Sequence, residues 1–322
     1  MVPVSEKYAA GAAAPRVPDA GLTAGPSLVI GASSQVGRFL LPRLAARGFQ
    51  VEALSRNPQP DTMPTLDRVR WITPAEARNR LPHYATLVSS GPLLLALDYA
   101  RAMPAARSFA VTSSSSVLSK AESRDPGERD VVEGLRQAEE GFRALARKHR
   151  IPLVILRPTL VYGCGLDRNL TRYAAFIRRF GFLPVSRRAG GLRQPVHADD
   201  VAQALVASLA PRERRELVAP LCGGDTVDYR GMVRRIFTAL DRPPRLLALP
   251  PPVFIAALRA ASLLRLSGEF SPEMIRRQAV NLVFDDSEAR RELGVRPRRF
   301  HPGREAFSLP DVNHLERLSQ RS

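Results

Sequence analysis

The architecture of this chain follows from one short segment near its N-terminus, Ser27-Leu28-Val29-Ile30-Gly31-Ala32-Ser33-Ser34-Gln35-Val36-Gly37. Its aliphatic run is typical of a buried strand, and the run ends at Gly31. A helical pattern of apolar residues follows and closes at Gly48. A strand, a glycine-bounded turn and a helix in this order are the context in which a turn can bind the pyrophosphate of a dinucleotide. A plain tight connection between strand and helix fits the same residues.

The turn has the features that phosphate binding needs. Gly31 allows a sharp turn, and Gly37 lets the helix pack closely on the strand. The start of the helix offers free N–H groups and the positive end of the helix dipole to an anion. Hydroxyl groups are added by two serines, of which Ser34 stands where the middle glycine of the usual signature would be. We therefore predict a cofactor site at Gly31, Ser33, Ser34, Gln35, Val36 and Gly37.

The end of the second predicted strand, residues 51–54, indicates which nicotinamide nucleotide is favoured. A carboxylate there would accept the ribose hydroxyls of NAD, whereas an arginine would pair with the 2′-phosphate of NADP. This chain has Ser55-Arg56-Asn57 and no carboxylate. Arg56 thus favours NADP and makes NAD the less favoured cofactor, with a solvated surface arginine as the alternative interpretation.

Further strands are predicted at residues 69–72, 85–88, 109–112 and 153–156, with helical segments between them such as 131–148. This alternation predicts an α/β fold, a Rossmann-type doubly wound parallel sheet with helices on both faces. The carboxyl ends of the strands then meet at one edge, where we expect the chemistry.

The same reading divides the chain into four parts. We expect a disordered leader over 1–26, which is rich in Ala, Gly and Pro, and a dinucleotide-binding domain over 27–165. A smaller, mostly helical substrate domain is expected over 166–310, partly interleaved with the sheet and carrying helices at 231–240 and 271–280. Residues 311–322 remain as a tail.

Composition narrows the class of protein. The chain has 322 residues, of which 44% are hydrophobic and 25% charged, and this balance is typical of a folded globular protein. Cys164 and Cys222 are its only cysteines, too few for a disulfide framework or a cysteine-rich metal site. A reducing cytoplasm is expected, with no metal. His197, Asp199 and Asp200 lie close in sequence, but we interpret them as a helix cap that ties the substrate domain to the sheet.

The net charge is +17, from 48 Lys and Arg against 31 Asp and Glu. Arginines account for nearly all the cations and run along the whole chain, and aromatic residues make up only 6%, which argues against a nucleic-acid partner. The excess favours a small anionic substrate or a membrane surface. Residues 250–268 are too short and too charged to span a bilayer. We favour a core helix there, with a peripheral amphipathic membrane helix as the alternative.

Four later segments complete a pattern. They are Thr112-Ser113-Ser114-Ser115-Ser116-Val117, Arg157-Pro158-Thr159-Leu160-Val161-Tyr162-Gly163, Asp167-Arg168-Asn169-Leu170, and residues 193–202. In this order, and together with the glycine turn, they resemble the NAD(P)-dependent epimerase/dehydratase family, the extended and atypical short-chain dehydrogenases/reductases. The resemblance covers roughly residues 27 to 305.

The resemblance implies roles for individual residues. Ser114 matches the serine that hydrogen-bonds the reacting hydroxyl or carbonyl, and Pro158 matches the segment beside the nicotinamide. Ser89, after the fourth predicted strand, belongs with the cofactor site. Asn169 and Arg193 match positions that hold a substrate diphosphate, and a planar guanidinium suits phosphate oxygens. The family implies hydride transfer on a nucleotide sugar or a similar anionic substrate. If the protein works at a membrane surface, a lipid-linked sugar diphosphate is the alternative substrate. An oligomer is also compatible with the sequence.

One feature of the family is missing. Its members use a Tyr and a Lys four residues later, on the helix after the fifth strand, to move the proton and hold the nicotinamide ribose. In this chain no tyrosine has a lysine four places on. The corresponding helix has Val131 or Val132 and Leu135 or Arg136 at these positions. The alternative function is therefore a non-catalytic dinucleotide-binding protein, a redox sensor or an assembly or accessory subunit.

Overall fold

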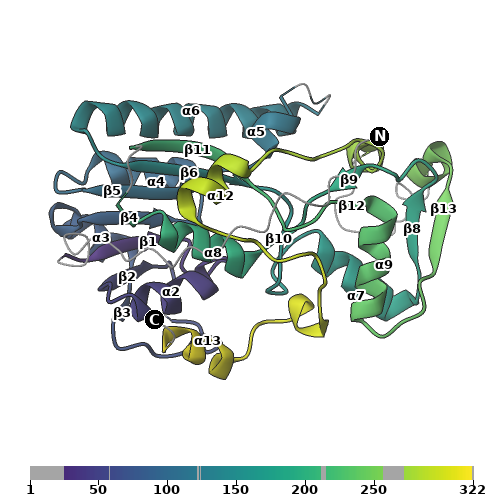
Figure 1. The fold of residues 1–322 in the computed structure, drawn as a ribbon, viewed down its shortest axis with the longest axis horizontal. Helices are drawn as coiled ribbons and strands as arrows, with labels where there is room; N and C mark the ends of the chain where they lie inside the picture. The colour runs from purple at the N-terminus through teal and green to yellow at the C-terminus, as the bar shows by residue number, and fades with distance from the viewer. Residues whose placement is uncertain are drawn as a thin grey trace.

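The computed structural model describes residues 25–57, 59–121, 123, 125–211, 215–256 and 272–320. Its centre is a seven-stranded sheet in the order β11-β6-β5-β4-β1-β2-β3 (Figure 1), in which all neighbouring strands are parallel. The strands are β1 (Ser27–Ile30), β2 (Val51–Leu54), β3 (Val69–Ile72), β4 (Thr86–Ser89), β5 (Ser108–Thr112), β6 (Leu153–Pro158) and β11 (Glu216–Leu221). The predicted Rossmann-type sheet is confirmed.

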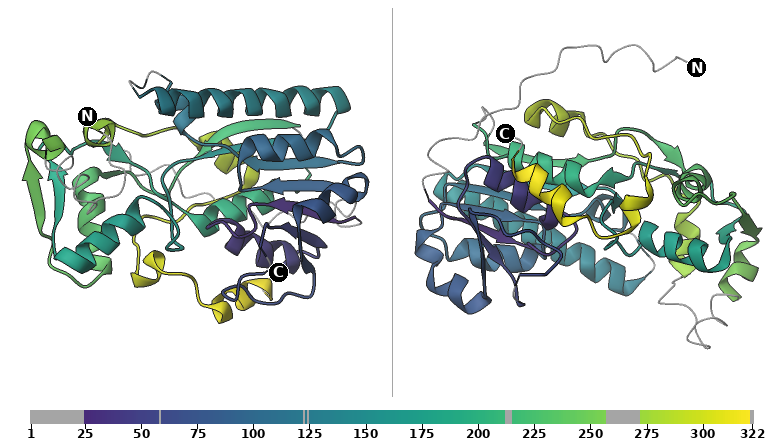
Figure 2. Two further views of the ribbon diagram at one scale, coloured as in Figure 1. Left: turned by 180° about the vertical axis from the view of Figure 1, so that it is seen from behind. Right: turned by 90° about the horizontal axis from the view of Figure 1, so that it is seen from below.

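Helices cover both faces of this sheet, as Figures 1 and 2 show. One face carries α2 (Gly37–Ala46), α8 (Ala198–Ala207), α12 (Ser287–Leu293) and α13 (Val312–Ser319). The other carries α3 (Pro74–Asn79), α4 (Leu93–Arg101) and α6 (Pro126–His149). Successive strand residues point to opposite faces, so Val29 packs in the first layer while Leu28 and Ile30 pack in the second. Because both faces of the sheet are covered by apolar layers, the residues of these strands are mostly hydrophobic on both sides and form continuous hydrophobic runs in the sequence.

Helix α6 begins earlier than the sequence pattern indicated, at Pro126 instead of residue 131. The Asp125 carboxylate accepts hydrogen bonds from the N–H groups of Gly127 and Glu128, and Pro126 occupies the first turn, where its missing N–H costs nothing. Asp-Pro is thus the start signal, although it precedes the apolar pattern by a full turn. The early start brings Glu128 to the N-terminal end of the helix.

Strand β11 was not predicted. It extends the sheet beyond β6, with Glu216 paired to Leu153 and Leu221 to Pro158. Its chain position places it in the range expected for the substrate domain, so the C-terminal half of the chain returns to the sheet. Residues 311–322, expected as a tail, contain α13, which packs against α2 and buries Leu315 and Leu318.

The smaller unit lies at one end of the sheet (Figure 1) and has a core of its own. It contains α7 (Leu170–Phe180) and α9 (Tyr229–Ala239), the parallel pair β8 (Leu183–Ser186) and β13 (Leu246–Leu249), and the antiparallel pair β9 (Leu192–Arg193) and β12 (Val227–Asp228). Helix α9 matches the helix predicted at 231–240. Helix α11 (Pro272–Arg277) ends three residues before the predicted 280.

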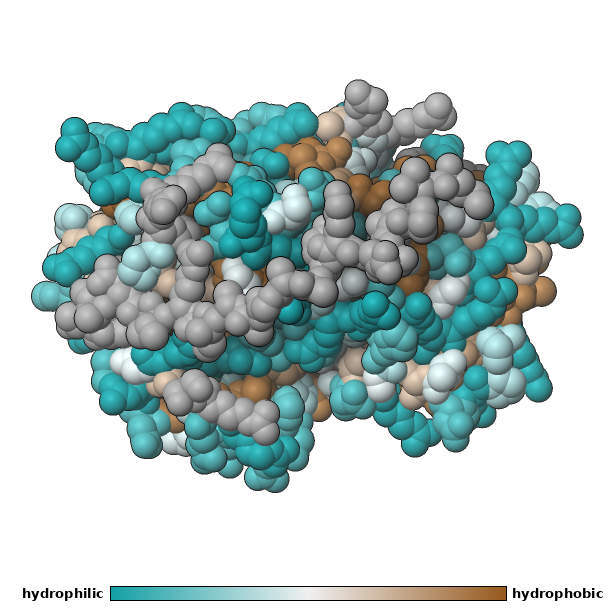
Figure 3. Space-filling model, in the orientation of Figure 1, coloured by the Kyte–Doolittle hydropathy of each residue, from teal (hydrophilic) through white to brown (hydrophobic). Residues whose placement is uncertain are grey.

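Most of the segment predicted to be a core or membrane-surface helix, 250–268, lies outside the described residues, since the description stops at 256 and resumes at 272. Within the described ranges, no helix has the length and apolar sequence needed to cross a membrane. The face of the molecule in Figure 3 is mainly hydrophilic, with apolar side chains showing in separate patches.

Candidate functional site

A cavity of about 660 Å³ opens where the carboxyl ends of the central strands meet the smaller unit. From the sheet side it is lined by the turn after β1, by the serine run after β5 and by the end of β6. From the other side it is lined by residues at the start of α7 and by side chains of β9, α9 and α11. The cavity therefore lies at the edge predicted for chemistry.

The glycine turn at the start of α2 has no room for larger residues. Gly31 has a φ of +80°, and a Cβ on it would lie 2.5 Å from the Gly91 nitrogen. A Cβ on Gly37 would lie 2.2 Å from the Gly31 carbonyl oxygen. Glycine is thus needed at both positions, one for its left-handed conformation and one for the close approach of helix and strand.

The side chains of the turn divide into two groups. Ser34 accepts a hydrogen bond from the Gly37 N–H at 3.0 Å and contacts the Ser90 hydroxyl at 3.0 Å. Ser34, Gln35 and Val36 line the cavity, whereas Ser33 is exposed and is not among the lining residues. Of the predicted cofactor residues in the turn, the structure therefore places three side chains against the cavity.

Two buried polar atoms of the lining lack a hydrogen-bond partner among the described residues, Gln35 Oε1 and Ser113 Oγ. Burying a polar group without a partner costs about 1–3 kcal/mol. Both atoms belong to residues that line the cavity, so a rotation of either side chain toward the cavity would let a polar ligand pair with it. The close turn, the helix N-terminus and these two atoms fit a bound dinucleotide, whose pyrophosphate and amide groups carry matching acceptors and donors.

Arg56 follows β2, is exposed, and does not line the cavity. Ser55, Arg56 and Asn57 place no carboxylate at this strand end. The one acidic residue of β2, Glu52, is buried and accepts a hydrogen bond from the Tyr84 hydroxyl at 2.5 Å, so it points away from the strand end into a polar cluster of its own.

Ser114 stands at the carboxyl end of β5, and its Oγ accepts a hydrogen bond from the Ser116 N–H at 3.1 Å and contacts the Ser116 hydroxyl at 3.0 Å. Both side chains line the cavity, as does Pro158 at the end of β6. Ser89 does not line it: its side chain is fully buried and accepts a hydrogen bond from the Gly91 N–H at 3.3 Å. Ser89 supports the neighbouring loop from behind.

On the far side of the cavity, Asn169 is exposed at the start of α7 and lines the cavity. Arg193 is 6% exposed, and its two terminal nitrogens donate to the backbone carbonyls of Leu192 at 2.8 Å, of Val280 at 2.6 Å and of Arg277. Burial lowers the pKa of its guanidinium, which also lies 5.5 Å from the centre of the Tyr229 ring. Arg193 thus faces the cavity while fixing the backbone around it.

The helix positions that carry Tyr and Lys in the family are apolar or outside the cavity. Val131 is 61% exposed and Val132 is buried. Leu135 packs partly buried against the α4–α6 layer, and Arg136 is exposed. None of the four lines the cavity.

His197 caps α8, and its Nδ1 accepts a hydrogen bond from the Asp199 N–H at 3.1 Å. Its ring packs against Phe39 and Tyr162, and burial, reinforced by Arg298, lowers its pKa to about 3. Asp199 pairs with Arg43 at 2.6 Å and with Arg298 at 2.7 Å. The group links α2, α8 and the segment after α12, and within the described ranges no cluster of metal-ligating side chains occurs.

Both cysteines are buried, and burial raises the pKa of Cys164 to about 11 and that of Cys222 to about 12. The thiols therefore stay neutral at physiological pH and are poor nucleophiles.

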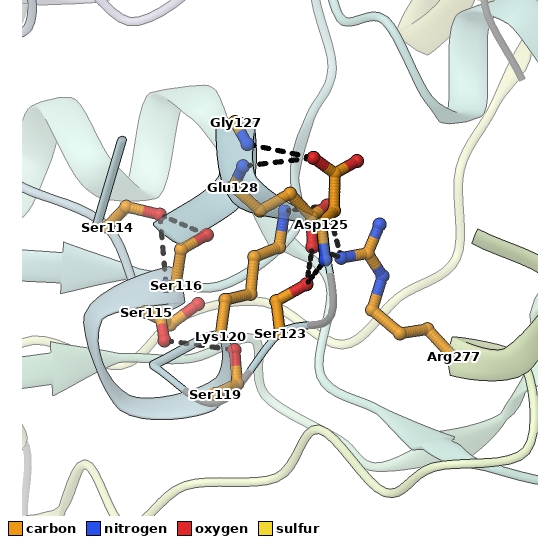
Figure 4. Close-up of polar contacts among 10 residues, drawn as sticks. All are labelled: Ser114, Ser115, Ser116, Ser119, Lys120, Ser123, Asp125, Gly127, Glu128 and Arg277. Atoms are coloured by element: carbon orange, nitrogen blue, oxygen red, sulfur yellow. Dashed lines mark hydrogen bonds and ion pairs between the residues drawn. The ribbon is translucent and has the colours of Figure 1, made fainter. Parts of the chain in front are cut away.

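Sequence reasoning missed one part of the cavity wall, shown in Figure 4. Lys120, the C-cap of α5 (Ser116–Ser119), and Arg277 of α11 both line the cavity, and both pair with Glu128 in the first turn of α6. Lys120 is one of only three lysines in the chain, which is a weak sequence signal for a functional role. No sequence pattern indicates that Arg277 contacts Glu128.

The chain is similar to known proteins in sequence over half its length and in fold over most of it. No family model matches the chain. Its sequence is 27% identical over 161 residues to a UDP-glucose 4-epimerase of Vibrio cholerae, a match that covers 50% of this chain and 47% of that enzyme. The chain thus spans about half the length of the curated relative.

Solved structures match over nearly the whole chain. The epimerase Mth375 of Methanothermobacter thermautotrophicus superposes with a TM-score of 0.66 and 16% identity, covering 91% of each chain. MoeE5, solved with UDP-glucose and NAD, superposes with a TM-score of 0.64 and 20% identity, covering 92% of this chain and 99% of its own. The resemblance to epimerases that the motifs indicated is confirmed, in sequence over half the chain and in fold over most of it.

Proposed function

We propose that this protein binds NADP with the pyrophosphate at the N-terminus of α2 and acts by hydride transfer on a nucleotide-sugar-like substrate in the same cavity. The observation that carries the proposal is the glycine turn opening into a cavity where Gln35 Oε1 and Ser113 Oγ are buried without partners. It is supported by MoeE5, a fold neighbour solved with UDP-glucose and NAD.

The chain's own residues would divide the work. The N–H groups of Gly37, Arg38 and Phe39 already donate within the chain, so the N–H groups of Gln35 and Val36, just before α2, would hold the pyrophosphate. Arg56 would pair with the 2′-phosphate. The nicotinamide supplies the hydride acceptor or donor when bound. Ser114 orients the reacting hydroxyl or carbonyl through its hydroxyl, which Ser116 already holds in place by two contacts. Asn169 and Arg193 face the substrate diphosphate from the opposite wall.

Cofactor choice is tested by titrating the protein with NADP⁺ and NAD⁺ in a calorimeter. We expect NADP⁺ to bind at least about tenfold more tightly, since one charge-assisted contact contributes about 1.5–3 kcal/mol. Arg56→Ala should remove the preference and leave NAD⁺ binding unchanged. Arg78→Ala, another exposed arginine outside the cavity, is the matched control. Equal affinities in the unaltered protein would contradict the NADP assignment.

A second candidate function is favoured by the residues at the positions of the family's Tyr and Lys, because none of them lines the cavity: Val131 or Val132, and Leu135 or Arg136. Without the Tyr and Lys, the protein could use the dinucleotide as a structural or regulatory ligand. The two functions are separated by incubating the protein with NADPH or NADP⁺ and a panel of nucleotide sugars, followed by product analysis. Turnover that disappears in Ser114→Ala supports catalysis. Tight cofactor binding with no product from any sugar supports the binding role.

A further inference from the structure

The wall of the cavity beyond Ser114 carries a pair of cations that no step of the proposed function uses. Lys120 comes from the end of α5, directly after the serine run, and Arg277 comes from the end of α11 in the smaller unit. Both side chains line the cavity, and they are 29% and 18% exposed. In Figure 4 they approach Glu128 from different sides.

A carboxylate already bridges the two cations. Glu128 Oε1 lies 3.2 Å from the Lys120 ammonium, and the Arg277 guanidinium hydrogen-bonds both carboxylate oxygens through Nη1. The Ser123 hydroxyl donates to Oε2 at 2.7 Å. Burial tends to raise the pKa of Glu128, but the hydrogen bonds from Arg277 and Ser123 and the charge of Lys120 lower it to about 2. The bridge therefore consists of two cations and one anion.

Most N–H donors of the pair have no acceptor among the residues that the structure describes. An ammonium carries three N–H donors and a guanidinium five. Within the described part of the chain, Glu128 is the one hydrogen-bond acceptor of both side chains. The backbone carbonyl of Arg277 accepts from Arg193, which anchors the residue at the cavity wall. With Glu128 counted, the three side chains carry a net charge of +1. Several N–H donors of Lys120 and Arg277 have no acceptor among the described residues, and their arrangement already accommodates one carboxylate.

We propose that Lys120 and Arg277 form an anion subsite, the Lys120–Arg277 subsite, which binds a carboxylate on the sugar end of the substrate while Glu128 holds the two cations in position. The substrate class is then a uronic acid or a nucleotide-linked uronic acid. One carboxylate would neutralise the excess charge. This inference rests on the proposed function for the place of the sugar beside Ser114.

The test compares sugars that differ only in the carboxylate. UDP-glucuronic acid and UDP-glucose are titrated into the full-length protein, and free D-glucuronate and D-glucose are compared by ligand-observed NMR. We expect the acid to bind at least about tenfold more tightly than its neutral partner, and the preference to fall to about threefold or less in Arg277→Gln and, separately, in Lys120→Gln. Circular dichroism checks that each variant is folded.

Arg276→Gln is the matched control, because it removes the same charge from an exposed neighbour that does not line the cavity. It should keep the preference. Equal binding of both UDP-sugars overturns the subsite and leaves the proposed function intact. A glucuronate preference without binding of either UDP-sugar supports the subsite and overturns the nucleotide-sugar substrate. Binding of none of the four ligands, or a preference that survives both cavity variants, overturns the subsite.

Discussion

The sharpest perturbation of the dinucleotide site is Gly37→Ala, which adds one methyl group at the start of α2. The new Cβ would lie 2.2 Å from the Gly31 carbonyl oxygen and 2.5 Å from that of Ala32. Ordinary contacts begin at 3.4 Å, so the helix N-terminus has to retreat from the turn by about 1 Å. Both obstacles are backbone atoms, which cannot rotate away as a flexible side chain would.

This displacement acts on the N–H groups that would hold the pyrophosphate. Each charge-assisted hydrogen bond contributes about 1.5–3 kcal/mol, so misplacing one should weaken binding by about tenfold to 150-fold. Isothermal titration of Gly37→Ala with NADP⁺ measures the loss directly. Unfolding in urea, followed by circular dichroism, measures the accompanying loss of stability.

Gly48→Ala is the matched control. Gly48 also adopts a positive φ, +82°, but a Cβ there meets nothing within 4 Å. Its cost is the strain of a left-handed residue, about 1–2 kcal/mol, with no displacement of the turn. We expect lower stability with unchanged affinity for NADP⁺. A folded Gly37→Ala protein that binds NADP⁺ within threefold of the unaltered chain would refute the placement of the pyrophosphate.

Three further predictions concern the buried charges and thiols. Arg298→Met removes the guanidinium that pairs with the buried Asp200 at 2.8 Å and leaves this carboxylate with the backbone N–H of residue 298. The loss should be about 3 kcal/mol in urea unfolding at neutral pH, and a loss below 1 kcal/mol would show that the pair is dispensable. His197 has a native pKa of about 3 against about 6.5 in the unfolded chain, so the unfolded state binds an extra proton between these values. Stability should therefore fall as the pH drops below about 6.5, by up to 1.4 kcal/mol per pH unit for this group, and His197→Asn should flatten that slope over pH 5–7. The thiols of Cys164 and Cys222 should react with a thiol-specific reagent only at the rate of unfolding, because both are buried with raised pKa values; fast labelling of the native protein would contradict this.

Much of the fold could be predicted because its signals are local. The aliphatic run before Gly31 and the alternation of strands and helices indicated the parallel sheet, and the structure confirmed it. Strand β11 was not predicted because it contains Pro220, a residue that counts against a strand, and because its place in the sheet depends on pairing with β6. The early start of α6 was missed because its signal, Asp125 followed by Pro126, lies outside the apolar periodicity.

The candidate site divides in the same way. The turn, Ser114 and Pro158 were predictable because each lies at the carboxyl end of a strand, and parallel strands bring those ends to one edge. Arg193 was identified by its motif, but its hydrogen bonds to backbone carbonyls became visible only in the folded chain. Ser89 lies behind the cavity and not in its wall, because its hydroxyl faces the next loop and accepts a hydrogen bond from the Gly91 N–H.

By itself, the sequence determined the class of fold, the glycine turn and the lack of a Tyr and Lys pair, since each is written within a few neighbouring residues or in their simple order. The tertiary structure alone decided that Lys120, Glu128 and Arg277 meet in one cavity wall. Their meeting depends on how the smaller unit packs against the sheet, and side chains 149 positions apart carry no local signal of contact. Hydrophobic packing of the elements that carry them brings the three residues close, and their ion pairs form between side chains already placed together.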